Sequence, residues 1–262
     1  MRRIPHNSAT ASFRRIRLIA HHTAGEAVRL RLTGLLILIG GGFVAGAFWL
    51  REFNFGSTEL KFIGDFGLGA IGGFGAVAAA LVTSQLFFND IHGRAAYCVL
   101  TRPVRRWEYV WGKLLGMAAL LALFTASLGT LLVALLLWRG AQIGAPAIPV
   151  PIVLCACALQ WFKLTLIAGM TLLVCSYSGS ALFASCAGLI LAVIAHLGIF
   201  FGESRLIVLR ILPNLSVFDA EKLMAFGQPP GAVMVFGVLA YWAAYLAVFG
   251  VIASHVFRHR EF

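Results

Sequence analysis

Charged side chains are scarce in this sequence. They make up only 12% of its 262 residues, whereas 60% of the residues are hydrophobic and the mean hydropathy is +0.90. Soluble domains carry about 25% charged residues, so this composition excludes an ordinary water-soluble globular fold. The lipid bilayer is therefore the main solvent of the chain.

Motifs of enzymes and nucleotide-binding proteins are also missing. The sequence has no HExxH, no GxSxG and no GxxxxGK[ST] loop, and its Gly112-Lys113 pair is followed by Leu114. We therefore expect no catalytic residue, no cofactor and no nucleotide site. Energy for transport would have to come from another chain or from an ion gradient. Transporters driven by an ion gradient commonly use acidic or His side chains within the membrane. Within the predicted spans, only Lys163 and His196 could serve in this way.

Cysteine is rare, and its positions suit neither a disulfide framework nor a zinc ribbon. The five cysteines are Cys98, Cys155, Cys157, Cys175 and Cys186, and four of them lie within or at the end of apolar runs. Soft thiolates such as a Cys155/Cys157 pair suit Cu(I). Buried, inert thiols are the favoured interpretation, so no metal site is expected.

Long apolar runs are what the sequence does contain. A membrane-spanning helix needs about 20 apolar residues, and six such runs occur, at residues 32–50, 66–88, 114–138, 152–175, 181–201 and 232–254. Strands of a membrane barrel would alternate polar and apolar residues, and these runs do not alternate. The sequence predicts an all-α integral membrane protein in which residues 32–254 form a six-helix domain.

The distribution of Lys and Arg predicts the orientation, because these residues are retained on the cytoplasmic side. They concentrate in residues 1–31, 89–113 and 255–262, which places both ends inside. The net charge of +11 then suits a lipid surface better than nucleic acid. Residues 13–32 predict an amphipathic helix on the inner leaflet, with Phe13, Ile16, Ala20, Ala24 and Ala27 on its apolar face. The tail, residues 255–262, is expected in the cytoplasm.

Glycines recur at spacings that permit close helix packing. A GxGxxG sequence occurs without the preceding strand that a dinucleotide site requires, so we expect its glycines to pack membrane helices together. Two GxxxG pairs are weaker signals of the same kind. These glycines are Gly67, Gly69 and Gly72 in the first motif, and Gly42 with Gly46 and Gly112 with Gly116 in the pairs.

Lys163 is the one charged residue inside a predicted span. An ammonium at that depth costs roughly 2.5 to 3.5 kcal/mol on insertion scales, so it needs a partner. One interpretation places Lys163 on a translocation surface or subunit interface, with Gln160 beside it on the previous turn. The other has the side chain snorkelling to the interface or held by backbone carbonyls. The sequence leaves both open.

The cytoplasmic connection 89–113 is longer than a simple loop requires. Its sequence predicts two short helices, the first capped by Asn89 or Asp90 and the second continuing into the third span. Pro103 would separate them, because it disfavours helical geometry at the preceding residue. Exposed aromatic residues beside arginines suit contact with a protein or with lipid head groups.

A pattern in this connection resembles that of ATP-binding-cassette (ABC) permeases of the second exporter type, especially the groups associated with multicopper-enzyme maturation and nitrous-oxide-reductase maturation. The matching residues are Asp90, Leu100, Arg102, Pro103, Val104, Arg106, Glu108, Tyr109, Gly112 and Lys113. Weaker matches occur at residues 26–29, 65–68, 213–215 and 260–262. The sequence departs from the pattern at Ala95, where Thr is expected, and in having Asp90 without an acidic neighbour.

The resemblance implies a permease subunit of a bacterial inner membrane that pairs with a second permease copy and binds cytosolic P-loop ATPases. It also implies that residues 90–101 form a coupling helix. The residues implied in coupling are Asp90, Arg94, Tyr97, Leu100, Arg102, Pro103, Arg106, Glu108, Gly112 and Lys113. A short helix below the membrane could transmit a nucleotide-driven movement to the second and third spans.

Two other functions are compatible with the composition. A membrane enzyme acting on lipid could use Lys163, His196 and external acidic residues. A membrane anchor would recruit an ATPase without moving any solute. The residues give no substrate and no direction of transport, although the resemblance favours export.

Overall fold

The computed structural model describes residues 9–49, 59–92, 106–144, 150–197, 212–219 and 232–258, and nearly all of these residues are helical. No strand occurs within these ranges. The helices in chain order are α1 (Ala9–Arg29), α2 (Arg31–Gly46), α3 (Glu59–His92), α5 (Arg106–Ile143), α6 (Val150–Tyr177), α7 (Ala181–Leu197), the 3-10 helix η3 (Leu215–Phe218) and α10 (Ala232–Arg258).

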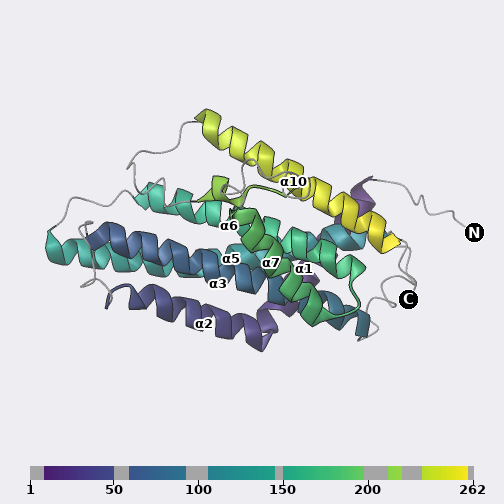
Figure 1. Ribbon diagram of the computed structural model, residues 1–262, viewed down its shortest axis with the longest axis horizontal. Helices are drawn as coiled ribbons and strands as arrows, with labels where there is room; N and C mark the ends of the chain where they lie inside the picture. Colours follow the sequence, from purple (N-terminus) through teal and green to yellow (C-terminus); the bar gives the residue numbers. More distant parts are fainter. Residues whose placement is uncertain are drawn as a thin grey trace, which may run out of the picture.

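The centre of the bundle is formed by α3, α5 and α6, which all contact one another (Figure 1). Helix α2 covers α3 and α5, helix α7 covers α3 and α6, and α10 packs on α5 and α6. Leu68, Leu121 and Leu164, one from each central helix, are completely buried. The apolar runs of the sequence thus supply both the interior of the bundle and its lipid-facing surface.

Several helices can cross a bilayer, so the protein is a multi-pass membrane protein. Four described helices are long and apolar enough, and the bent pair α1 and α2 makes a fifth if counted as one span. Helices α2 and α7 have only 16 and 17 residues. At about 1.5 Å per residue they fall short of a hydrocarbon layer roughly 30 Å thick. Residues 50 and 198–201 of the two predicted spans lie outside the described residues.

The ends of α3, α6 and α10 lie at the same end of the bundle as the starts of α5 and α7 (Figure 1). Helix α1 lies there too, because it packs against the first turns of α5. One end of the bundle therefore carries the described parts of the three basic segments, 1–31, 89–113 and 255–262.

The expected close packing of the α3 glycines is confirmed. A Cβ built on Gly67 would lie 2.4 Å from Leu132 Cδ1 of α5, and one on Gly75 would lie 2.4 Å from Leu164 Cδ1 of α6. These contacts leave no space for a side chain. Gly69 has nothing within 4 Å of such an atom and instead lines a cavity.

The second GxxxG pair, Gly112 and Gly116, forms the part of α5 on which the N-terminal helix α1 packs. Cβ atoms on Gly112 and Gly116 would lie 2.6 Å from Ile19 and Thr23 of α1, respectively. Helix α1 begins and ends a few residues before the predicted range 13–32. It bends by 64° into α2 at Leu30. Ala27 is buried in the bundle, whereas Phe13 is 68% exposed, because α1 turns its Thr23 side towards α5.

Helix α3 is longer than the predicted second span, and it corrects one expectation. It runs through Asn89 and Asp90 to His92, so neither residue caps a separate helix. Beyond the apolar run, α3 is held to α5 at this end by Lys113, which contacts Asp90 and the Leu86 carbonyl. Helix α5 runs without a break from Arg106 through Gly112 and Lys113 into the third span, as predicted. Residues 93–105 lie outside the described part of the chain.

Candidate functional site

Lys163 forms an ion pair inside the helical bundle. Its Nζ lies 2.8 Å from Oδ1 of Asp219, and the two side chains are 12% and 22% exposed. His196 of α7 joins them, with its Nδ1 3.8 Å from the same oxygen. The ion pair places Lys163 inside the described bundle, and a translocation role stays a prediction. A carboxylate offsets the cost of the ammonium at this depth.

Asp219 reaches Lys163 because a short segment of the last predicted external loop folds back into the bundle. Leu215 and Phe218 of η3 are completely buried. Asn214 begins the segment: its side chain accepts a hydrogen bond from the Ser216 backbone N–H at 3.1 Å, and its own N–H donates to the Tyr241 hydroxyl at 2.7 Å.

The position of Asp219 indicates how deep this segment lies. Lys163 is near the midpoint of α6, and His196 is next to the last residue of α7. The described part of α7, which stops at Leu197, therefore reaches about half-way along α6, and η3 lies at the same level. Sequence reasoning placed Asp219 in an external loop and missed this contact. The only sequence signal was the apolar stretch Leu215 to Phe218 beside a carboxylate.

A cavity of about 420 Å³ adjoins the ion pair. One wall consists of the small residues of α3, and apolar side chains of α6, α7 and η3 form most of the rest. The polar lining consists of Gln160, Lys163, His196 and Asp219. The site thus combines an apolar interior with a few convergent polar groups, which is typical of sites for small ligands.

Gln160 is the unusual member of this lining. The residue is 4% exposed, and its Oε1 has no hydrogen-bond partner among the residues that the structure describes. The amide lies against α3, where a Cβ on Gly72 would approach Oε1 to 3.0 Å. A buried polar atom without a partner costs about 1 to 3 kcal/mol. Gln160 and Lys163 both line this cavity, and a role of either residue in translocation or at an interface stays a prediction.

A second polar cluster closes the end of the bundle from which the 93–105 connection departs. Lys113 Nζ lies 2.8 Å from Asp90 Oδ2 and donates a hydrogen bond to the Leu86 carbonyl at 3.2 Å. The Tyr109 hydroxyl donates to the same Asp90 oxygen at 2.6 Å. The last turns of α3 and the first turns of α5 are thereby joined on both sides of the connection.

Glu108 links this cluster to the N-terminal helix. Its Oε1 lies 3.0 Å from Nη2 of Arg15, and the Glu108 side chain is fully buried. We call the contacts of Asp90, Tyr109 and Lys113 between α3 and α5 the polar base of the bundle. The Arg15 to Glu108 contact and the packing of α1 on Gly112 and Gly116 join α1 to it.

The structure describes only part of the coupling residues implied by the resemblance. Asp90, Glu108, Tyr109 and Lys113 hold the base together, and Gly112 receives α1. Arg106 begins α5. The others lie outside the described residues, namely Arg94, Tyr97, Leu100, Arg102 and Pro103.

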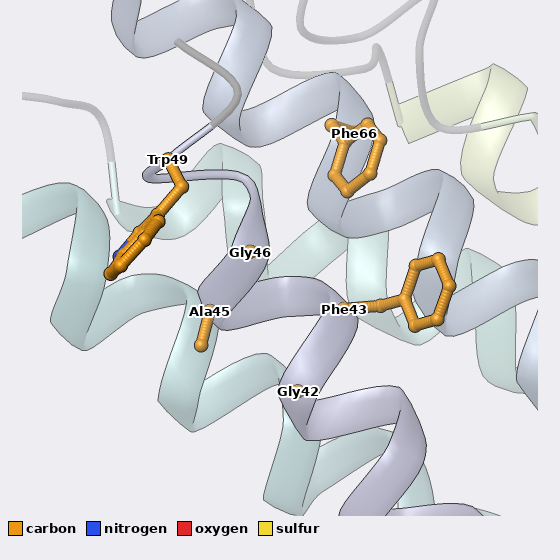
Figure 2. A pocket seen from close by; sticks show the side chains of 6 residues that line it. All are labelled: Gly42, Phe43, Ala45, Gly46, Trp49 and Phe66. Atoms are coloured by element: carbon orange, nitrogen blue, oxygen red, sulfur yellow. The ribbon is translucent and has the colours of Figure 1, made fainter.

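An apolar groove of about 510 Å³ lies at the far end of α2 from α1. Figure 2 shows Trp49 on one side of it and the rings of Phe43 and Phe66 on the other, with Gly42 and Gly46 between. No atom of the described chain comes within 4 Å of a Cβ built on either glycine. The first GxxxG pair thus packs no helix within the described chain.

The CxC cysteines point in different directions, because residues two apart on a helix lie about 200° apart around its axis. Cys157 is buried, and its Sγ would lie 2.8 Å from a Cβ on Gly129, whereas Cys155 is partly exposed. No group of three His, Cys, Asp or Glu residues able to hold a metal ion occurs in the described ranges.

Comparison with known proteins adds no family assignment: no protein-family model matches the chain, and no curated protein matches its sequence. The functional argument therefore depends on the residues and their contacts.

Proposed function

We propose that this chain is the permease subunit of an ABC transporter of the second exporter type, in a bacterial inner membrane. A separate cytosolic P-loop ATPase would supply the energy, and the chain itself would be non-catalytic. The observation that carries the proposal is the polar base formed by Asp90, Tyr109 and Lys113, because it ties together the two helices that flank a long basic connection.

The base gives the connection a mechanical role. A force applied to residues 93–105 would reach α3 and α5 together, since their ends are joined by buried polar contacts. The Arg15 to Glu108 contact would carry the same movement into α1. Packed helices move as rigid bodies over such distances. A docked ATPase could thereby reorient several spans with one contact.

Both ends of the chain are proposed to lie in the cytoplasm, with six spans in total. Support comes from the charge distribution and from the grouping of α1, the start of α5 and the end of α10 at one end of the bundle. The half-length α7 and the returning η3 would then face the outer side.

A second copy of the permease is proposed to pack on the α2 groove. Small residues let membrane helices approach closely, and a Cβ built on Gly42 or Gly46 would meet no other described helix within 4 Å. The cavity beside Lys163 would be the part of the translocation path contributed by one copy.

The experiment for this proposal is co-expression with the P-loop ATPases of the source bacterium, followed by purification through a tag on the permease. A stoichiometric ATPase and ATP-dependent transport in proteoliposomes are expected. Binding of an ATPase without any transport would instead identify a membrane anchor. Absence of every P-loop ATPase would refute the proposal.

A membrane enzyme acting on lipid is the second candidate. The observation that favours it is the meeting of Lys163, His196 and Asp219 beside an apolar cavity, since such groups can transfer protons. Turnover of lipid by the purified chain alone would support this function, and the His196→Gln variant should then lose the activity.

A further inference from the structure

The N-terminal helix α1 turns a basic face away from the bundle. Its inner face packs on α5, where Thr23 lies against Gly116. Arg14 is nine residues from Thr23, which places the two side chains on opposite sides of the helix axis. Arg17 and His21 lie within about 60° of Arg14 around that axis, and all three side chains are exposed. They form one stripe on the outer face of α1.

The arginines of this stripe have no counter-charge within the described chain. Arg14 and Arg17 form no ion pair with any described residue, whereas their neighbour Arg15 turns inward to Glu108. The only acidic residue of α1 is Glu26, and its Oε2 is buried. The outer face of α1 therefore carries unbalanced positive charge.

Two connections indicate the depth of α1 relative to the bilayer. The helix packs on Gly112 and Gly116, which bracket residue 114, where the apolar run of the third span begins. At its other end a single residue, Leu30, separates α1 from α2, whose apolar run begins at residue 32. The bend of 64° at this link turns α1 away from the axis of α2. Both connections put α1 beside the bundle at the depth of the lipid head groups, with its outer face towards neighbouring lipids.

Large apolar side chains flank the two arginines on this face. Phe13 and Leu18 are 68% and 59% exposed. Around the helix axis, Phe13 lies on one side of the Arg14 and Arg17 pair and Leu18 on the other. Exposed cations beside large apolar groups suit the membrane interface, where phosphates and acyl chains meet. A soluble anion would contact the arginines alone.

We propose that the outer face of α1 binds the head group of an anionic phospholipid, with Arg14 and Arg17 on its phosphate and Phe13 and Leu18 against its acyl chains. Residues three apart are neighbours on a helix surface, so both guanidinium groups reach one phosphate. The His21 ring adds an N–H donor on the same face in either protonation state. This binding does not depend on the proposed transport function.

The charge of the face selects among phospholipids. All of them offer a phosphate, but a zwitterionic head group also brings an ammonium group close to the arginines, where it is repelled. An anionic head group brings no such cation. The structure thus favours phosphatidylglycerol over phosphatidylethanolamine and phosphatidylcholine.

Titration of these three lipids, with identical acyl chains, into the purified full-length chain in detergent tests the proposal, with native mass spectrometry as the readout. Phosphatidylglycerol should bind about tenfold more tightly than either zwitterionic lipid, given two arginines at the interface. Millimolar inorganic phosphate should not displace it, because the acyl chains contribute to binding. Equal binding of the three lipids would overturn the proposal. Displacement by phosphate would show a site for a soluble anion and would overturn it as well.

Exposed variants with a matched control locate the site. Arg14→Gln and Arg17→Gln should each weaken phosphatidylglycerol binding about fivefold, and the double variant should weaken it further. Lys61→Gln is the control, because Lys61 also forms no ion pair with a described residue but lies in the first turn of α3, at the other end of the bundle. It should leave the affinity unchanged. An equal loss in the control would show unspecific attraction to net charge, and unchanged binding by the double variant would show a different site; either result refutes the proposal.

A protein partner is the alternative occupant of this face. Loss of a co-purifying ATPase from the Arg14→Gln/Arg17→Gln variant, without any preference for phosphatidylglycerol in the unaltered chain, would assign the face to that protein and overturn the lipid proposal. A chain that prefers phosphatidylglycerol through these arginines but co-purifies with no ATPase would retain this site and lose the proposed function.

Discussion

Arg15 of the N-terminal helix contacts Glu108 in the first turn of α5, with 3.0 Å between Nη2 and Oε1. The Glu108 carboxylate is fully buried although it lies next to the basic connection 93–105. This contact makes the amphipathic helix α1 a part of the helical bundle rather than an appendage on the membrane surface.

The first prediction concerns this pair. Glu108→Gln should lower the free energy of unfolding by about 1 to 3 kcal/mol, less than the ~3 to 5 kcal/mol of fully buried pairs, because Arg15 is partly exposed. Thermal unfolding in detergent measures the change. Arg15→Gln combined with Glu108→Gln should be closer to the unaltered protein than Glu108→Gln alone. Strictly additive losses would contradict a direct interaction.

The second prediction tests the packing of α1 on α5. A Cβ on Gly116 would lie 2.6 Å from Thr23 Cβ and 2.8 Å from the Ala20 carbonyl oxygen. Gly116→Ala should therefore destabilise the protein by about 1 to 3 kcal/mol through overpacking. It should also speed proteolysis at the arginines of α1.

The matched control for this change is Gly25→Ala on α1, where an added Cβ meets nothing within 4 Å. This variant should be neutral or more stable by up to about 1 kcal/mol, because alanine favours helix more than glycine does. Equal stability of the Gly116 and Gly25 variants would contradict the described contact.

The third prediction concerns Lys163 and Asp219. Lys163→Leu should insert into the membrane but unfold at a lower temperature, because it leaves the Asp219 carboxylate without its cation. Lys163→Leu with Asp219→Leu should recover much of that loss. Transport should remain impaired in both variants if Lys163 lies on the translocation path, and full transport by the single variant would exclude that role.

The fourth prediction addresses the connection 93–105, which we propose to lie in the cytoplasm. Cysteines at positions 94 and 97 should crosslink to the partner ATPase, and Arg94→Glu should weaken its docking without changing membrane insertion. Pro103→Ala should impair coupling more than docking. An ATPase that crosslinks only to residues 1–31 would refute the proposed coupling helix.

Asp90 should behave differently from Arg94. Because Asp90 pairs with Lys113 inside the base, Asp90→Asn should lower thermal stability as well as the coupling of ATP hydrolysis to transport. Assays of ATPase binding and of melting temperature on the same preparations would separate the two effects. Unchanged stability of Asp90→Asn would show that the ion pair does not hold the base.

Much of the molecule follows from its sequence alone. Apolar runs of about 20 residues require helices in lipid, because backbone groups there must be satisfied within the segment, and four described helices accordingly have the predicted character. The glycines of α3 indicated close packing for a local reason: without a side chain, a neighbouring helix can approach. The cost of an unpaired charge in hydrocarbon predicted that Lys163 needs a partner, and the structure provides one in Asp219.

Tertiary contacts decided the rest. Hydropathy cannot show that His196 on α7 lies level with Lys163 on α6 or that η3 packs beside both helices, since both depend on packing between segments distant in sequence. Likewise, Asp90 looked like a helix cap, but its carboxylate meets Lys113 and Tyr109 from another helix and α3 continues past it. Composition determined which segments enter the bilayer, and the pairing of buried charges across helices determined how they are joined.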